Sequence, residues 1–221
     1  MDEEIGEIIK SMQNSNSNFF YGFNFIEGIL CGQKCVVVLC GVGKVHAAMC
    51  TQTMIIKYNP KFIINIGVAG GIGENINIGD IVIADSVLQH DFDVSPFRPK
   101  GEISGLDITN IPCSSYLNNK IYNSIKELSD YSVHIGPIMT GDQFINSSDT
   151  LEMLNCQFHG IACEMEGGSI GQVCYVNKIE FAVIRIISDK ANDTSHVDFS
   201  QFVKYSSKLC FKLIIELLKQ I

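Results

Sequence analysis

The segment IACEMEGGSI at 161–170 places two carboxylates on either side of a methionine. Glu164, Met165 and Glu166 follow a short apolar run and lead into a predicted helix. Side chains of this kind at a strand end cannot all belong to the core, and their negative charge could serve acid–base or electrostatic chemistry. Alternatively, Glu166 is only an acidic residue in the first turn of a helix, where the helix dipole favours it.

A second candidate is the segment VIRIISDKAND at 183–193. Arg185 lies within an otherwise apolar predicted strand, and Ser188 and Asp189 end that strand. Because a buried arginine is rare without a partner, we expect a carboxylate or a fixed water molecule beside Arg185.

Three further segments could contact a ligand. In TGDQFINSS at 140–148, Phe144 and Ile145 lie between polar residues, which suits stacking on a flat ring and main-chain hydrogen bonds to its edge. The glycine-rich turns CGVGKV at 40–45 and GVAGGIG at 67–73 lack the patterns of nucleotide phosphate loops. They nevertheless place bare backbone at strand ends, where open α/β sheets bind ligands, unless they are merely tight strand-to-helix turns.

The elements that position these residues are predicted from hydrophobic patterning. Near-continuous apolar runs predict strands buried on both faces, at 35–40, 62–66, 81–85 and 181–187. Helical spacing over 44–58 completes a strand–helix–strand crossover unit. A long amphipathic helix runs from Asp198, its expected N-cap, to the C-terminus. Residues 92–115 are predicted to form a long loop.

Composition excludes several classes of protein. The chain has 221 residues, is 46% hydrophobic and carries a net charge of −8 with only two arginines, which argues against a nucleic-acid partner. Nine scattered cysteines without a C-x-x-C pair indicate neither disulfides nor a metal site, and suit a reducing cytoplasm. No apolar run is long enough for a membrane span, and the acidic N-terminus lacks the basic region of a signal peptide.

The set of GVGKV, INIGVAGGI, GDIVIAD, HDFDV, GDQFI, CEMEGG and RIISDKAND, in this order, resembles the 5′-methylthioadenosine/S-adenosylhomocysteine nucleosidases of the purine nucleoside phosphorylase superfamily. This resemblance implies an α/β fold: one three-layer αβα domain over 1–221, with a central mixed, partly barrel-like sheet flanked by helices. In the family an apolar strand precedes the acidic element that matches MDEEI. The sequence starts at Met1, so either the start site is misassigned or the sheet lacks this first strand, and we expect the strand to be lacking.

The resemblance also implies a reaction, the hydrolysis of the N-glycosidic bond of methylthioadenosine and S-adenosylhomocysteine, with 5′-deoxyadenosine as a further substrate. The reaction serves methionine salvage and removal of a methyl-cycle by-product, and needs no metal or cofactor. Asp189 matches the general acid at the adenine, and Glu166 the carboxylate at the ribose hydroxyls. Glu4 matches the general base, which with Arg185 holds the attacking water.

The remaining matches are contacts to the substrate, a small 5′-thio-substituted adenosine. They are Val68, Ala69, Gly70, Phe144, Ile145, Glu164, Met165, Ser188, Met1, Val42, Phe199, Val94 and Phe97. The resemblance also implies a homodimer in which Val94 and Phe97 line the partner's 5′ pocket. Two alternatives stay open: a purine nucleoside phosphorylase, which needs an arginine cluster for phosphate, and a non-catalytic nucleoside-binding protein.

Overall fold

Two sheets and six helices make up the part of the chain that the computed structural model describes. The described residues are 2–128, 131–191 and 195–221, without the side chains of 2–4, 195–201 and 203–205. The strands are β1 (Gln13–Phe20), β2 (Phe23–Leu30), β3 (Gln33–Val37), β4 (Phe62–Gly71), β5 (Ile81–Gln89), β6 (Ile111–Pro112), β7 (Val133–Thr140), β8 (Ala162–Glu164) and β9 (Glu180–Asp189). The helices are α1 (Asp2–Ser11), α2 (Lys44–Tyr58), α3 (Ser115–Lys126), α4 (Ser148–Phe158), α5 (Gly167–Asn177) and α6 (Ser195–Leu218).

Five strands close into a barrel. Strand β5 pairs with β7, β7 with β8, β8 with β4, β4 with β9 and β9 again with β5, in a mixture of parallel and antiparallel directions. Short β6 pairs with Ser86 and Val87 of β5, beyond the residues of β5 that pair with β9. The apolar run at 81–84 is completely buried, as expected of strands covered on both faces. The expected mixed, partly barrel-like sheet is confirmed.

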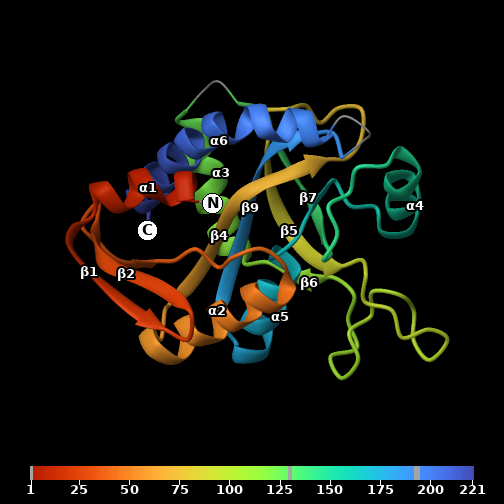
Figure 1. The fold of residues 1–221 in the computed structure, drawn as a ribbon, viewed down its shortest axis with the longest axis horizontal. Coiled ribbons are helices and arrows are strands. Elements are labelled where there is room, and N and C mark those ends of the chain that lie inside the picture. Colours follow the sequence, from red (N-terminus) through yellow and green to blue (C-terminus); the bar gives the residue numbers. More distant parts are fainter. Residues whose placement is uncertain (1, 129–130, 192–194) are drawn as a thin grey trace.

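Helices cover both sides of this barrel (Figure 1). Helices α2 and α5 pack against each other on one side, and α3 and α6 on the other. Leu209, Leu213 and Leu217 of α6 are buried against the cluster that contains Ile184 and Ile186 of β9. At roughly 1.5–3 kcal/mol for each buried leucine, α6 belongs to the core. No helix within the described ranges has the length and apolar character needed to cross a membrane.

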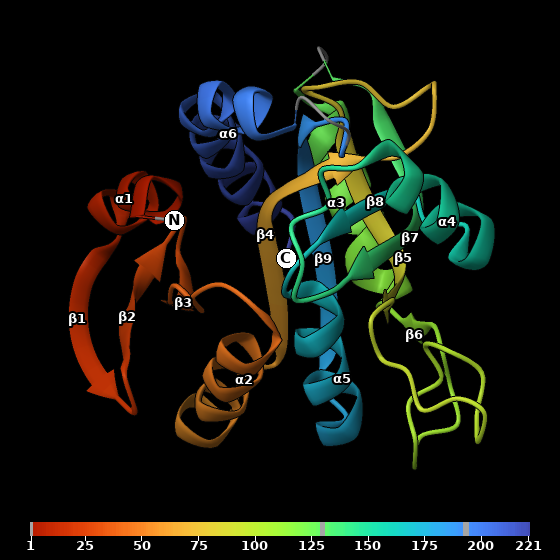
Figure 2. The same cartoon turned by 45° about the vertical axis from the view of Figure 1, so that its right-hand side comes forward.

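The strand–helix–strand unit was predicted correctly only in part. Helix α2 has the expected bounds, but β3 ends at Val37, is partly exposed, and pairs with β2 in a separate three-stranded sheet. Figure 2 shows this sheet standing apart from β4. A cavity of about 930 Å³ lies between this sheet and β4. Residues of β2, β3 and β4 line the cavity, together with side chains such as Ile8, Cys50 and Leu218.

The start of α6 and the long loop at 92–115 differ in part from the sequence-based predictions. Helix α6 starts at Ser195, so Asp198 lies inside the helix and its predicted role as N-cap is wrong. The long loop at 92–115 contains a bridge between Ile103 and Ile108 and the two residues of β6. Gly101 holds this loop against α4, because it has φ of +85° and a Cβ there would lie 2.8 Å from the ring of Phe158.

Candidate active site

The ends of β4, β8 and β9 meet at one point of the barrel. Gly70 is paired with Cys163 on one side and with Asp189 on the other. The loop after β7 lies over the same point, so the segments around 70, 144, 164 and 189 meet although they are far apart in sequence. A small pocket there is lined by Gly70, Gln143, Phe144, Ile145, Cys163, Glu164, Met165 and Asp189.

Asp189 lies at the end of β9 and is 2% exposed. Its Oδ1 accepts a hydrogen bond from the backbone N–H of Ala191 at 2.8 Å, and its Oδ2 accepts one from the hydroxyl of Ser188 at 2.8 Å. A Cβ at Gly70 would lie 3.0 Å from Oδ1 and 2.7 Å from the side chain of Ala191. Gly70 therefore leaves the space that this carboxyl group needs, and the carboxyl group is held rigidly against the pocket.

Arg185 and Glu164 form a buried ion pair below the pocket. The guanidinium donates to Glu164 Oε2 and to the side chain of Asn65, and to the carbonyl oxygen of Ile184 at 2.9 Å. Burial lowers the pKa of Arg185, but the negative charges of Glu164 and Glu166 and the hydrogen bond to Glu164 together raise it above the usual value. The expected partner of the buried arginine is thus found, and it is a carboxylate.

Glu164 is occupied by protein groups on both oxygens. Besides Arg185, it accepts hydrogen bonds from the Thr140 hydroxyl and from the backbone N–H groups of Glu166 and Gly167, the latter two at 3.0 and 2.8 Å. Burial raises the pKa of Glu164, but the charge of Arg185 and these donors lower it further, so the pKa lies below that of an ordinary glutamate. Glu164 is therefore an anion at neutral pH and fixes the turn that carries Glu166.

Glu166 occupies the N-cap position of α5. Its Oε1 accepts a hydrogen bond from the backbone N–H of Gly43 at 2.8 Å, which connects α5 to the turn before α2. Ser169, one turn further along α5, donates its hydroxyl hydrogen to the carbonyl oxygen of Lys44 at 2.6 Å. The two carboxylates predicted from the sequence thus have different surroundings. Hydrogen-bond donors enclose Glu164, whereas Glu166 lies between its own segment CEMEGG and the turn GVGKV.

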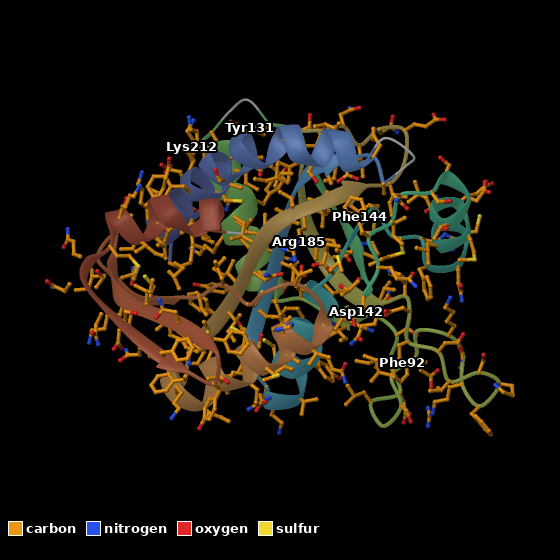
Figure 3. The ribbon with its side chains drawn as sticks, viewed as in Figure 1. Phe92, Tyr131, Asp142, Phe144, Arg185 and Lys212 are labelled. Atoms are coloured by element: carbon orange, nitrogen blue, oxygen red, sulfur yellow. The ribbon has the colours of Figure 1, made fainter. Side chains whose placement is uncertain are left out.

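The loop at 141–147 supplies the aromatic side of the pocket. Ile145 is buried against Ile72, Cys163 and Ala191, whereas Phe144 is 46% exposed. Figure 3 shows Phe144 and Arg185 near the centre of the molecule and Phe92 on the protruding loop. An aromatic face beside an aliphatic side chain and a buried carboxyl group suits a flat heterocycle with polar edges.

The structure does not place every expected site residue at this pocket. Val42 lies next to Gly43, but its side chain is 66% exposed. Phe97 lies on the same protruding loop as Val94 and is 89% exposed. Met1 and the side chains of Glu4 and Phe199 lie outside the described residues. Helix α1, which carries Glu4, packs against α6 and β2.

Four residues that the sequence reasoning did not select belong to the site. Gln143 and Cys163 line the pocket, Thr140 binds Glu164, and Asn65 binds Arg185. Asn65 could have been selected from the sequence, because it is the one polar residue in the apolar run FIINI. Cys163 could not have been selected, since a cysteine within an apolar run is typical of a core.

Comparisons with known proteins extend over the whole chain. A model of the phosphorylase superfamily matches residues 1–219. The 5′-methylthioadenosine/S-adenosylhomocysteine nucleosidase of Shewanella sp. (strain MR-7) is 40% identical over 98% of this chain and 93% of its own length. The crystal structure of the Neisseria meningitidis nucleosidase in complex with methylthio-immucillin-A has a TM-score of 0.96 at 30% identity, covering 100% of this chain and 96% of that one. A futalosine hydrolase mutant of Helicobacter pylori has a TM-score of 0.95 at 29% identity, with coverage of 100% and 96%.

Proposed function

Because the chain belongs to the phosphorylase superfamily and, within it, to the 5′-methylthioadenosine/S-adenosylhomocysteine nucleosidases, we propose that it hydrolyses the N-glycosidic bond of these two nucleosides. The products are adenine and the 5-substituted ribose. The observation that carries this proposal is the buried, doubly hydrogen-bonded Asp189 in the pocket that Phe144 and Ile145 line. We place the reaction in the cytoplasm, because all nine cysteines are free thiols.

Asp189 acts as the general acid in this mechanism. Adenine stacks on Phe144, and its N7 edge faces the carboxyl group of Asp189. When the bond between C1′ and N9 breaks, the electron pair moves into the purine, and a proton from Asp189 lets it leave as a neutral base. The hydrogen bonds from Ser188 and Ala191 orient the carboxyl group, so little reorganisation is needed during the reaction.

Glu166 stabilises the sugar as it becomes an oxocarbenium ion. Its carboxylate binds the ribose hydroxyls, and its negative charge favours the developing positive charge. Gly43 and Glu164 hold its side chain and its backbone, respectively. Met165, which precedes Glu166 in the sequence and lines the pocket, is the side chain that we expect against the sugar.

Glu4 is the proposed general base that takes a proton from the attacking water. Arg185 can contribute only a little to holding that water. Its two terminal nitrogens already donate to Glu164, to the side chain and carbonyl oxygen of Asn65, and to Ile184. Of the five N–H groups of an arginine, only that on Nε makes no hydrogen bond to the described residues. We therefore assign Arg185 chiefly to the ion pair with Glu164.

Replacing Glu4 with glutamine is expected to lower the rate of adenine release by roughly 10²-fold, the lower end of what losing a general base costs. Glu3→Gln is the matched control, because it makes the same change at the adjacent position and should leave the rate unchanged. Adenine formed from methylthioadenosine is the measurement. Equal rates for the two variants would remove Glu4 from the mechanism.

The same adenine assay tests the proposal as a whole. Methylthioadenosine, S-adenosylhomocysteine and 5′-deoxyadenosine form the substrate panel, and each active substrate should yield adenine without added phosphate. A phosphorylase would instead form ribose 1-phosphate. That outcome is disfavoured, because Arg98 is paired with Glu102 and Asp107, and Arg185 with Glu164. Saturable binding without any product would indicate a nucleoside-binding protein.

We also propose a homodimer formed through the outer face of α2 and α5. The side chains of Val45, Met49 and Ile56 on α2 and Val176 on α5 are between 50% and 70% exposed, although α2 and α5 pack side by side. Several exposed apolar side chains on two adjacent helices are typical of an interface between protein chains. The exposed Phe97 suits the proposed role of Val94 and Phe97 at the 5′ pocket of the partner.

Met49→Glu is therefore expected to give a monomer in size-exclusion chromatography with light scattering. Met153→Glu on α4 is the matched control, since Met153 is 53% exposed and Met49 is 50% exposed. Only the first variant should change the mass of the particle. A wild-type protein that elutes as a monomer at micromolar concentration would refute the proposed dimer.

A further inference from the structure

We propose that Asp91 is a positioning residue that fixes the ribose-binding side of the site relative to the adenine-binding loop. The inference rests on the proposed function, and it concerns residues that lie outside the pocket. Asp91 lies two residues beyond the end of β5. The geometry makes it the common anchor of two segments that are remote in sequence.

The carboxylate of Asp91 bridges the turn before α2 and the loop after β7. Its Oδ1 accepts a hydrogen bond from Lys44 Nζ at 2.6 Å, and its Oδ2 accepts one from the backbone N–H of Asp142 at 2.9 Å. The side chains of Lys44 and Asp91 are only 18% and 20% exposed, so the pair is partly protected from water. Burial raises the pKa of Asp91, but these donors lower it further, to below its usual value.

A second set of hydrogen bonds connects the same two segments. Asp142 Oδ1 accepts a hydrogen bond from the backbone N–H of Lys44 at 2.7 Å. The approach is close, because a Cβ at Gly43 would lie 2.9 Å from Asp142 Oδ1, and Gly43 has φ of +91°. Since the N–H of Gly43 binds Glu166, a shift of the loop at Asp142 would be passed on to the ribose carboxylate.

The buried ring of His90 packs against the start of the loop at 141–147. It is 2% exposed, and a Cβ at Gly141 would lie 2.2 Å from its Nε2, so the ring lies directly against the backbone of Gly141. The backbone N–H of His90 donates to the carbonyl oxygen of Thr140 at 2.9 Å. Burial lowers the pKa of His90, which keeps the ring neutral beside Lys44. Packing thus fixes the start of the loop, and Asp91 fixes its next residue.

The consequence for the reaction follows from the position of Phe144. It comes two residues after Asp142, so releasing Asp142 frees the segment that stacks on adenine. The same release loosens Gly43 and, through it, Glu166. Because displacements of about 1 Å from residues remote from the reacting atoms can cost about 10²-fold in rate, the loss of Asp91 should affect both base binding and turnover.

Asp91→Asn is the main test, with Asp107→Asn as its matched control. The asparagine in Asp91→Asn can still accept from Asp142 but loses the charge that holds Lys44, whereas Asp107 is an ion-paired aspartate on an exposed loop, with its side chain 68% exposed. For Asp91→Asn we expect kcat to fall about 10-fold and the inhibition constant of adenine to rise several-fold, with amide hydrogen exchange over 141–147 faster than in wild type. For Asp107→Asn we expect kcat, the inhibition constant and exchange within twofold of wild type.

Lys44→Met provides an independent variant, because it leaves the bond between Asp91 and Asp142 in place. If the pair acts as a unit, the double variant should be no slower than the slower single variant. Unchanged kinetics in Asp91→Asn and Lys44→Met would overturn the proposal, even if exchange over 141–147 became faster. If wild type released no adenine at all, the proposed function would fail, while hydrogen exchange would still decide whether Asp91 holds the loop.

Discussion

Replacing Asp189 with asparagine is expected to lower the rate of adenine release by about 10²- to 10⁴-fold, the cost of losing a general acid. Asparagine has nearly the same shape, and its Oδ1 can still accept the hydrogen bond that Ala191 donates at 2.8 Å. It cannot supply a proton to the departing purine. Adenine formation from methylthioadenosine measures the loss, and adenine should still bind, because Phe144 and Ile145 are unchanged.

Asp85→Asn is the matched control for this variant. Asp85 is an exposed aspartate on another barrel strand, β5, and it too has a neighbouring serine that donates to it. We expect its rate and its thermal midpoint to equal those of wild type. A rate for Asp189→Asn within tenfold of wild type would contradict the assignment of Asp189 as the acid, provided that the variant has the same circular dichroism spectrum.

The parts of the site that were predictable from the sequence are those in which one residue conflicts with its local pattern. Arg185 in an apolar strand required a partner, and the structure supplies Glu164. The sequence could not say which carboxylate this would be, because Glu164 and Glu166 are only two residues apart. The choice depends on how the strands pair, since β8 places Glu164 next to Thr140 of β7.

The contacts around Asp91 could not be predicted, although GVGKV and HDFDV were both recognised as motifs. Lys44 and Asp91 are 47 residues apart, and their hydrogen bond depends on how α2 is placed beside the end of β5. Likewise, the apolar pattern of 35–40 indicates a strand but not the sheet to which it belongs. Such patterns report local burial, whereas strand order is set by long-range pairing.

Replacing Glu164 with glutamine is expected to destabilise the protein by about 3–5 kcal/mol, because it leaves the guanidinium of Arg185 buried without a counter-charge. Glutamine also offers a single oxygen to the donors that now share two, namely Arg185, Thr140 and the backbone N–H groups of Glu166 and Gly167. The free energy of unfolding from urea titration at neutral pH measures the effect.

Glu102→Gln is the matched control, since Glu102 pairs with the only other arginine of the chain. That pair is only partly buried, with side-chain exposures of 37% for Arg98 and 23% for Glu102, so its loss should cost about 1 kcal/mol or less. If both variants lost the same free energy of unfolding, burial would not make the pair of Arg185 and Glu164 more stabilising than the partly exposed pair.

Acidification separates the charge of Glu164 from its shape. Since the folded state lowers the pKa of Glu164, its stabilising contribution is fully present above the unfolded-state pKa of about 4.3 and is lost as the pH falls through the lower, folded-state value. Wild type should therefore lose stability below about pH 5 more steeply than Glu164→Gln, which has no proton to gain at this position. Parallel pH profiles would contradict this expectation, because they would mean that folding leaves the pKa of Glu164 unchanged.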